Sequence, residues 1–509
     1  MESKQFGENL YGENSVRNEC EPKDHIEDVA NRFCKLVEVK SCEDSGAGSE
    51  NVVNSNISEK NDIDSFVEVN QVFICNKEDN NPTSKDTFNA AANYSDKGNS
   101  SEVAANDENI NGVDKMDCES EVKGILFQYP EYNFKQLIEI CKSSKPFGLD
   151  KFLVGCKWSP DGTCLLSNCA DFTIRLFDLP MQLYNKKIWS RKEVLPELLP
   201  SLQVIEGGQI YDYEWYPFMS STLPDTCCFL TTSSRSPVHL WDAYTGKLRA
   251  TYRGYNRVDE TDNAMCVKFS LNGEKIYCGY KNEIKIFATP VPGRDCINID
   301  TKHVAGQTGL ISCIAENPAV PNMFAAGSYK RTIGLYLESG DSICLLNGQR
   351  CGVTHLLWSH DGICLFSGGR KDNEIICWDV RNPGEVLYTM ERLVDTNQRI
   401  YFDITPDGKY LISGNTNGEV TGWDLSETTD ISPKRKQHFK FQSHLDCVNG
   451  VSVHRQIPLL ATSSGQHHFP DFTSDDEDNE FFDMKKMITR IENNIKLWWI
   501  GPSEEYQET

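Results

Sequence analysis

The chain has 509 residues, a hydrophobic fraction of 39% and a formal net charge of −24 at pH 7. This length allows one large closed domain with appendages, and the low hydrophobic fraction excludes a chain that is globular throughout. The first residues, MESKQFGENL, lack the apolar run of a secretory signal, and no stretch reaches the ~18 apolar residues of a membrane helix. We therefore expect a protein of the cytosol or nucleus, in which the 20 cysteines act as small core residues.

The acidic charge is concentrated in the appendages. Residues 1–123 contain 12 Lys or Arg and 27 Asp or Glu, many Asn and Ser, and no Trp. Such a segment cannot bury enough apolar surface to offset the ~1–2 kcal/mol per residue that backbone ordering costs, so it is predicted to be a disordered acidic N-terminal region. Ten more carboxylates lie in residues 471–483 and in an acidic C-terminal tail, 503–509. The remaining chain is close to neutral and can present a basic face.

Seven units between Phe152 and Trp499 each run strand, polar turn, strand and a bulky aromatic ending. The endings are Phe177, Trp241, Phe287, Tyr336, Trp378, Trp423 and Trp498. Four of the six intervals between them are 42 to 49 residues long, near the ~40–45 residues of a four-stranded propeller blade. The two longer intervals predict insertions at about 180–206 and 466–494. The expected fold is an all-β, seven-bladed WD-repeat β-propeller over residues 124–502.

Unit six, residues 399–425, illustrates the sequence pattern of one blade. The alternation in RIYFDI predicts a strand, and Pro406-Asp407-Gly408 predicts a tight turn, because Pro fixes φ and Gly accepts positive φ. The same turn recurs as WSPDG (158–162), FSLNG (269–273) and WSHDG (358–362). A single blade cannot bury both faces, so neighbouring blades must stack into a ring. Residues 124–131 could supply the strand that closes it.

The turn between the second and third strand of each unit opens on one rim of such a propeller. In units two to five, these turns carry Arg235, Tyr280, Lys281, Tyr329, Lys330, Arg331, Arg370 and Lys371. Cations bind phosphates, and flat rings stack on splayed bases, so this arrangement suits single-stranded RNA. The alternative is that solvated turns simply tolerate Lys and Arg.

The sequence contains no motif typical of catalysis or of metal binding. The sequence contains no Walker-type phosphate loop, no nucleophile elbow and no His-Glu zinc helix, so we do not expect an enzyme. It also contains no Cys-x-x-Cys pair, and we expect neither a metal site nor a cofactor. Lys434, Arg435 and Lys436 follow Ser432-Pro433 in the loop after unit six. This cluster is either a nuclear import signal or a solvated basic loop.

Longer strings that extend through turns and inter-blade loops carry a family resemblance. They are FLVGCKWSPDGTCLLSNCAD (152–171), HLWDAYTGKLRATYRGYN (239–256), PGRDC (292–296), GLISCIA (309–315), GSYKRTIGLY (327–336), SGGRKDNEIICWD (367–379), TNQRIYFDITPDGKYLISG (396–414) and CVNGVSVHRQIPLLATSSGQ (447–466). These strings resemble the telomerase Cajal body protein family, WD-repeat proteins also known from the antisense strand of the p53 gene. The resemblance covers about residues 147–502, including the insertion in the last blade and the IKLWW ending.

The resemblance implies a nuclear RNA-binding propeller that recognises the CAB box of small Cajal body RNAs and, where present, of telomerase RNA. Such a protein directs H/ACA-type particles to Cajal bodies and supports telomere maintenance by telomerase; a share is expected in the cytoplasm. The implied partners are H/ACA particle proteins such as dyskerin, coilin, survival motor neuron protein and, for folding, the cytosolic chaperonin. The matched strings SYKRT and GGRKD make Lys330, Arg331, Arg370 and Lys371 the first candidates for RNA contacts.

A protein-only scaffold is the alternative class of function, since many propellers bind proteins alone. The basic turns would then grip an acidic peptide while the ring assembles nuclear ribonucleoprotein or other complexes. RNA crosslinked to the propeller would favour the first class, and protein contacts alone would favour the second.

Overall fold

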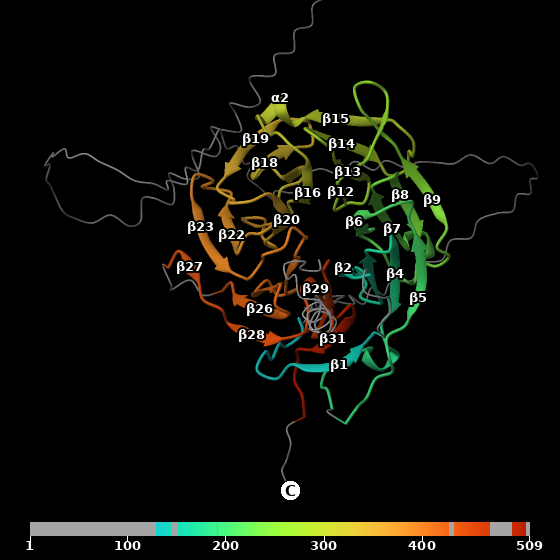
Figure 1. The fold of residues 1–509 in the computed structure, drawn as a ribbon, viewed down its shortest axis with the longest axis vertical. Coiled ribbons are helices and arrows are strands. Elements are labelled where there is room, and N and C mark those ends of the chain that lie inside the picture. Colours follow the sequence, from blue (N-terminus) through green and yellow to red (C-terminus); the bar gives the residue numbers. More distant parts are fainter. Residues whose placement is uncertain (1–128, 144–150, 191, 427–431, 469–490, 505–509) are drawn as a thin grey trace, which may run out of the picture. The chain divides into compact units, whose positions relative to one another are not determined.

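The computed structural model describes residues 129–143, 151–190, 192–426, 432–468 and 491–504. Within them, seven antiparallel sheets are arranged in a ring, as Figure 1 shows, so the predicted all-β, seven-bladed propeller is confirmed. No helix in these residues is long and apolar enough to cross a membrane. The predicted disordered region, 1–123, and the acidic run at 471–483 lie outside the described residues.

Blades 1 to 3 follow one another along the chain. Blade 1 contains β2 (Leu153–Trp158), β3 (Cys164–Cys169), β4 (Thr173–Asp178) and β5 (Pro200–Ile205), with the 3-10 helix η1 (Met181–Leu183). Blade 2 contains β6 (Ile210–Trp215), β7 (Cys228–Ser233), β8 (Ser236–Asp242) and β9 (Leu248–Tyr252), with η2 (Pro224–Thr226). A hairpin of β10 (Gly254–Tyr255) and β11 (Thr261–Asp262) precedes blade 3, which contains β12 (Cys266–Phe269), β13 (Lys275–Gly279), β14 (Glu283–Ala288) and β15 (Cys296–Asp300).

Helix α2 (Thr301–Ala305) leads into blades 4 to 7, which complete the ring. Blade 4 contains β16 (Ile311–Glu316), β17 (Met323–Ser328), β18 (Thr332–Leu337) and β19 (Ser342–Asn347). Blade 5 contains β20 (Val353–Trp358), β21 (Cys364–Gly369), β22 (Glu374–Asp379) and β23 (Val386–Glu391), and the short β27 (Lys434–Arg435) pairs with it. Blade 6 contains β24 (Phe402–Ile404), β25 (Tyr410–Gly414), β26 (Glu419–Asp424) and β28 (Phe439–Gln442). Blade 7 contains β29 (Val448–Val453), β30 (Leu459–Ser464), β31 (Ile495–Trp499) and β1 (Ile138–Lys142).

Burial changes from the inside of a blade to its outer edge. All residues of β17 and β30 are buried, because these strands lie between two neighbouring blades. Their sequences, MFAAGS and LLATSS, contain many small side chains that let the blades pack closely. The outermost strand β5 is instead half-exposed. The sequences of interior strands are therefore continuous runs of apolar or small residues. Apolar and polar residues alternate clearly only in strands with one face exposed to solvent.

The recurrent polar turns join the first and second strands of the blades. In blade 1 the Ser159 hydroxyl donates to Asp161 Oδ1 at 2.7 Å. The Gly162 amide donates to Ser159 O at 2.9 Å, and Gly162 has a φ of +75°. WSHDG in blade 5 repeats both contacts. The predicted tight turns are confirmed.

The tryptophans that end blades 2 and 7 have a polar contact as well as a packing role. Trp241 Nε1 donates to Thr231 Oγ1 at 2.8 Å, and Trp498 Nε1 donates to Thr462 Oγ1 at 3.0 Å. In blade 7, His444 Nε2 lies 2.8 Å from the same threonine hydroxyl. These hydrogen bonds connect the loop before blade 7 to the interior of that blade, so they fix the loop on the rim.

The ring is closed by a different segment from the one predicted. Residues 124–128 lie outside the described residues, and Tyr129–Glu131 form no strand. The closing strand is β1, which pairs antiparallel with β31 and places Ile138 opposite Trp499. Just before it, Phe134 stacks on Phe439 of blade 6 with ring centroids 4.1 Å apart. The prediction relied on local apolar residues, whereas pairing with a strand more than 350 residues away selects the next segment.

The first insertion is shorter than predicted. Residues Pro200–Ile205 form β5, the outer strand of blade 1, so the inserted segment is 179–199. Within it, Trp189 packs against Trp499 of blade 7 with ring centroids 5.9 Å apart. The second insertion separates β30 from β31, as expected, but its residues 469–490 are not described.

A buried histidine fastens blade 7 to blade 1. His454 Nδ1 accepts the amides of Gln456 and Ile457 at 3.0 and 3.1 Å, so Nε2 carries the proton and donates to Gly162 O at 2.9 Å. Burial lowers the pKa of His454 to about 4. A second proton would have to enter between Nδ1 and two N–H groups, and the charged ring has no place in this seam.

We expect the free energy of unfolding to fall as the pH falls from about 6.5, the pKa of an unperturbed histidine, toward 4. The unfolded imidazole takes up a proton that folded His454 excludes, and this linkage amounts to up to about 3 kcal/mol. Urea melts at pH 7, 5.5 and 4.5 measure it. His454→Gln should reduce the pH dependence, whereas His360→Gln, which alters an exposed ring, should leave it intact. Equal pH dependence in both variants would contradict the assignment.

Candidate nucleic-acid interface

The turns between the second and third strands lie along one rim, and backbone contacts join them across blades 3 to 5. Lys281 forms a bridge with Leu310, and Leu310 O accepts the Tyr329 amide at 3.0 Å. In the next blade the Arg370 amide donates to Gly352 O at 3.0 Å. Gly352 in turn lies against the Tyr329 backbone. The three turns therefore form one continuous surface.

The cations of these turns form a group that we call the basic arc. Its members are Arg235, Lys281, Lys330, Arg331, Arg370 and Lys371. All are exposed except Arg370, which is half-buried, and none forms an ion pair with a described residue. Two neighbouring carboxylates have other partners: Glu374 lies 3.6 Å from Arg350, and Glu283 lies 2.9 Å from Lys285. Neither carboxylate is therefore paired with a cation of the arc.

The two predicted tyrosines lie in different surroundings. Tyr280 is 1% exposed, and its hydroxyl packs so closely on Gly254 that a Cβ there would clash. The alternation of β13 continues past its end, so Tyr280 points into the same core cluster as Cys278 and cannot offer a stacking surface. Tyr329 is half-buried, and the Arg370 guanidinium carbon lies 3.4 Å from its ring centroid.

Two cations of the arc occupy a strained backbone conformation. Arg331 has a φ of +71° and Lys371 a φ of +48°. The turns of blades 6 and 3 use Gly418 and Asn282 in this region, with φ of +87° and +59°. Gly and Asn enter it readily, whereas other residues pay about 1 kcal/mol or more. Phe172 has a φ of +66° in the equivalent turn of blade 1, so positive φ is a property of this turn and not of the cations alone.

Buried polar groups hold the blade 5 turn from below. Trp378 Nε1 donates to Ser367 Oγ at 2.9 Å, and Ser367 Oγ donates to Gln349 Oε1 at 2.8 Å. Gln349 Nε2 then donates to Asp372 Oδ2 at 2.7 Å. Asp372 follows the arc cations directly but is 2% exposed, so its carboxylate faces inward. Burial lowers the pKa of Arg392 to about 10, and Asp372 opposes that shift. Its charge is thus balanced within the blade.

An ion-pair network crosses the centre of the ring. Arg399 Nη1 lies 3.0 Å from Asp212 Oδ1, and its Nη2 donates to Ser312 O at 2.7 Å. Lys157 Nζ lies 2.6 Å from Glu214 Oε2. Burial raises the pKa of Glu214, but Lys157 and a second ion-pair partner, Lys268, outweigh burial and lower it to about 2. These contacts link the inner edges of blades 1 to 4 with the loop before blade 6.

This network was not among the predictions from the sequence. Its signal is the period-two placement of charge in the innermost strands, as with Asp212 and Glu214 in IYDYEW of β6. An apolar strand that carries charges at alternate positions faces a polar interior. The pattern indicates that charged side chains line the central axis of the ring, but it does not identify the residue with which each of them pairs.

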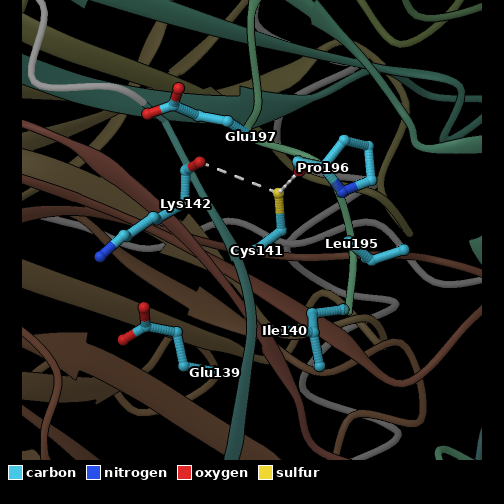
Figure 2. A pocket seen from close by; sticks show the side chains of 7 residues that line it. All are labelled: Glu139, Ile140, Cys141, Lys142, Leu195, Pro196 and Glu197. Carbon is cyan, nitrogen blue, oxygen red and sulfur yellow. Dashed lines mark hydrogen bonds between the residues drawn. The ribbon is translucent and has the colours of Figure 1, made fainter. Parts of the chain in front are cut away.

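A pocket of about 290 Å³ lies beside the closing strand, and Figure 2 shows the side chains that line it. It is lined by Glu139, Ile140, Cys141, Lys142, Leu195, Pro196 and Glu197. Cys141 Sγ donates to Pro196 O at 3.0 Å, and burial raises the pKa of this thiol to about 11. The thiol therefore stays protonated and acts as a donor between β1 and the blade 1 insertion. The pocket belongs to the seam of the ring and not to the basic arc.

The predicted import cluster is partly built into the fold. Lys434 and Arg435 form β27, which pairs with β23. Lys434 forms an ion pair with Glu391, and the Arg435 guanidinium lies 4.2 Å from the Tyr388 ring centroid. Lys436 is exposed. Its role as a nuclear import signal stays a prediction.

Two segments of the chain match the family described as "WD domain, G-beta repeat", at residues 150–178 and 340–379. Together with seven four-stranded blades, this match places the protein among the WD-repeat β-propellers, a class of scaffolds.

The similarity to individual proteins is more specific. Telomerase Cajal body protein 1 of Mesocricetus auratus is 44% identical over 379 residues, which are 73% of this chain and 70% of the relative. The Homo sapiens protein is 43% identical over 378 residues, or 73% and 68% of the two chains. The Drosophila melanogaster homolog is 38% identical over 371 residues, or 68% and 65%. The chain belongs to the telomerase Cajal body protein family, and the resemblance seen in the sequence is confirmed.

Replacing the strained cations by Asn should stabilise the fold. We expect Arg331→Asn and Lys371→Asn each to raise the free energy of unfolding by up to about 1 kcal/mol, because Asn tolerates positive φ. Urea denaturation measures the change. Gly418→Ala is the opposite control, since its Cβ would clash with His444 O and should lower stability. Destabilisation by both Asn variants would show that Arg331 and Lys371 make structural contacts.

Proposed function

We propose that this protein is an RNA-binding scaffold that recognises the CAB box of small Cajal body RNAs, and of telomerase RNA where one is present. It directs these H/ACA-type particles to Cajal bodies and supports telomere maintenance through telomerase. Residence in the nucleus and Cajal body, with a share in the cytoplasm, belongs to the same proposal. The names of relatives at 38–44% identity support it.

The basic arc is the observation that carries the proposal. Six cations from four adjacent blades share one rim, and none has a carboxylate partner in the described residues. Their turns are rigid, because backbone hydrogen bonds and the buried Asp372 relay fix them. Preorganised cations suit a flexible single strand, since the protein then loses little entropy on binding.

The same geometry gives room for protein partners. A ring has two rims and an outer wall, so RNA on the basic arc leaves the remaining surface for proteins. We propose dyskerin and other H/ACA particle proteins, coilin and survival motor neuron protein as partners there, and the cytosolic chaperonin as the folding partner. Slow formation of a ring closed between its two ends is consistent with a need for assisted folding.

The alternative is that the arc grips an acidic peptide and the protein contacts no RNA. Its six unpaired cations fit that partner in charge. Crosslinking in cells separates the two, because recovery of H/ACA RNAs on propeller peptides supports the proposal. Recovery of protein contacts alone would replace it with the protein-only scaffold.

Charge reversal in the arc tests the RNA site directly. We expect Arg370→Glu with Lys371→Glu to weaken binding to a synthetic CAB-box hairpin by about tenfold or more, because phosphate contacts are lost and repulsion appears. Fluorescence anisotropy measures the affinity. The matched control is Lys247→Glu with Lys409→Glu, which makes the same change in net charge at exposed positions in turns of the opposite rim.

The salt dependence gives a second measure. If four arc cations engage phosphates, log affinity should fall with log salt concentration with a slope of about −3, since each contact on a single strand contributes ~0.7. The arc double variant should have a shallower slope, and the control variant should keep it. Equal affinity of the arc and control variants would remove the arc from the site.

A further inference from the structure

One contact of the basic arc has a geometry unlike the rest. Arg370 from blade 5 lies with its guanidinium carbon 3.4 Å from the ring centroid of Tyr329, which belongs to blade 4. This distance is van der Waals contact with the ring face. The tyrosine therefore covers one face of the guanidinium and orients it, while the other arc cations end in solvent.

Backbone contacts hold both partners in place. The Tyr329 amide donates to Leu310 O and the Arg370 amide to Gly352 O, each at 3.0 Å. A Cβ on Gly352 would approach Tyr329 O to 2.8 Å and Arg370 Nε to 3.3 Å. Glycine at this position lets the two turns come together, so the stack is a built feature of the rim.

The polar edge of Arg370 is available to a ligand. Its Nε is buried and has no hydrogen-bond partner among the described residues. Its two terminal nitrogens are neither buried nor paired with a described carboxylate. The adjacent Asp372 is directed to Gln349 at 2.7 Å, and Glu374 lies by Arg350. A guanidinium with one face covered and no salt bridge presents its fork of N–H donors outward.

The fork fits one nucleobase edge better than the others. An arginine donates two parallel hydrogen bonds to O6 and N7 of guanine, whereas adenine presents its N6 amino group, a donor, at the same place. Splayed bases of single-stranded RNA expose this edge. Lys330 and Lys371 flank the stack in the same two turns and can neutralise phosphates as point charges.

We propose that the Tyr329–Arg370 pair reads a guanine of the bound RNA through its O6 and N7 atoms, with Tyr329 as the platform that positions the guanidinium. The proposal rests on the proposed RNA-binding function and adds to it the identity of one base. In this arrangement Lys330, Arg331 and Lys371 supply affinity without base preference, and Arg370 supplies specificity.

The test uses the full chain and a CAB-box hairpin with modified loop guanines. Replacement of one guanine by 7-deazaguanine, which lacks the N7 acceptor, should weaken wild-type binding roughly 5- to 150-fold. Inosine keeps O6 and N7 and should bind like guanine. Arg370→Met removes both the charge and the donor fork, so it should bind the guanine RNA more weakly and no longer respond to 7-deazaguanine.

Controls separate base reading from general affinity. Lys371→Gln should weaken both RNAs equally and keep the discrimination. Tyr329→Phe should behave as wild type, whereas Tyr329→Leu should lose discrimination together with the platform. Melting temperatures of all variants should stay within a few degrees of wild type, because the substitutions lie on the rim.

Three results would overturn the assignment or its basis, and they are distinguishable. If Arg370→Met still discriminates against 7-deazaguanine, another residue reads the base. If no guanine responds but one loop methylphosphonate is coupled to Arg370→Met, then Arg370 contacts a phosphate. If the wild-type chain binds neither RNA, the proposed function itself fails.

Discussion

The pairing of β1 with β31 is the interaction on which the rest of the structure depends. It joins Ile138 to Trp499 from opposite ends of the propeller sequence, and the Ile495 amide donates to Ser143 Oγ at 2.9 Å beside it. A four-stranded blade cannot bury both faces, and an open ring would expose two sheet edges. Closure removes both edges and fixes the angle between blades. The turns of blades 3, 4 and 5 can then touch one another, and the rim becomes a surface.

In the closed ring, cations and carboxylates of the same turn also point in different directions. Two carboxylates of the blade 5 turn face inward or have a cation of their own: Asp372 is held by Gln349, and Glu374 lies by Arg350. The arc cations have no such partner among the described residues. A chain with a net charge of −24 can therefore present a positive rim, because the sign of the local field follows from which side chains are buried and paired.

Local patterns in the sequence were sufficient for the blades, because Gly162 and its equivalents mark turns and each blade repeats the same order of strands. They also placed the six cations on one rim, since antiparallel strands return every second turn to the same side. They were insufficient where a contact with a residue that is distant in the sequence determines the local structure. The closing strand is determined by its pairing with β31, which places Ile138 opposite Trp499. Pro200–Ile205 forms a strand because it pairs with β4. Tyr280 is buried because residues of blade 2 cover it. Turn composition alone contains none of these contacts.

The rim and the centre of the ring both contain cations, but they differ in what a ligand would have to displace. Arg399 and Lys157 are bound to Asp212 and Glu214, and separating such partly buried pairs leaves a carboxylate without compensation. A phosphate at the centre would have to displace a carboxylate from such a pair. On the basic arc it displaces only counterions and water, a step that favours binding at moderate salt. The basic arc therefore suits an anionic strand better than the centre does, because the cations of the centre are paired and hold the blades together.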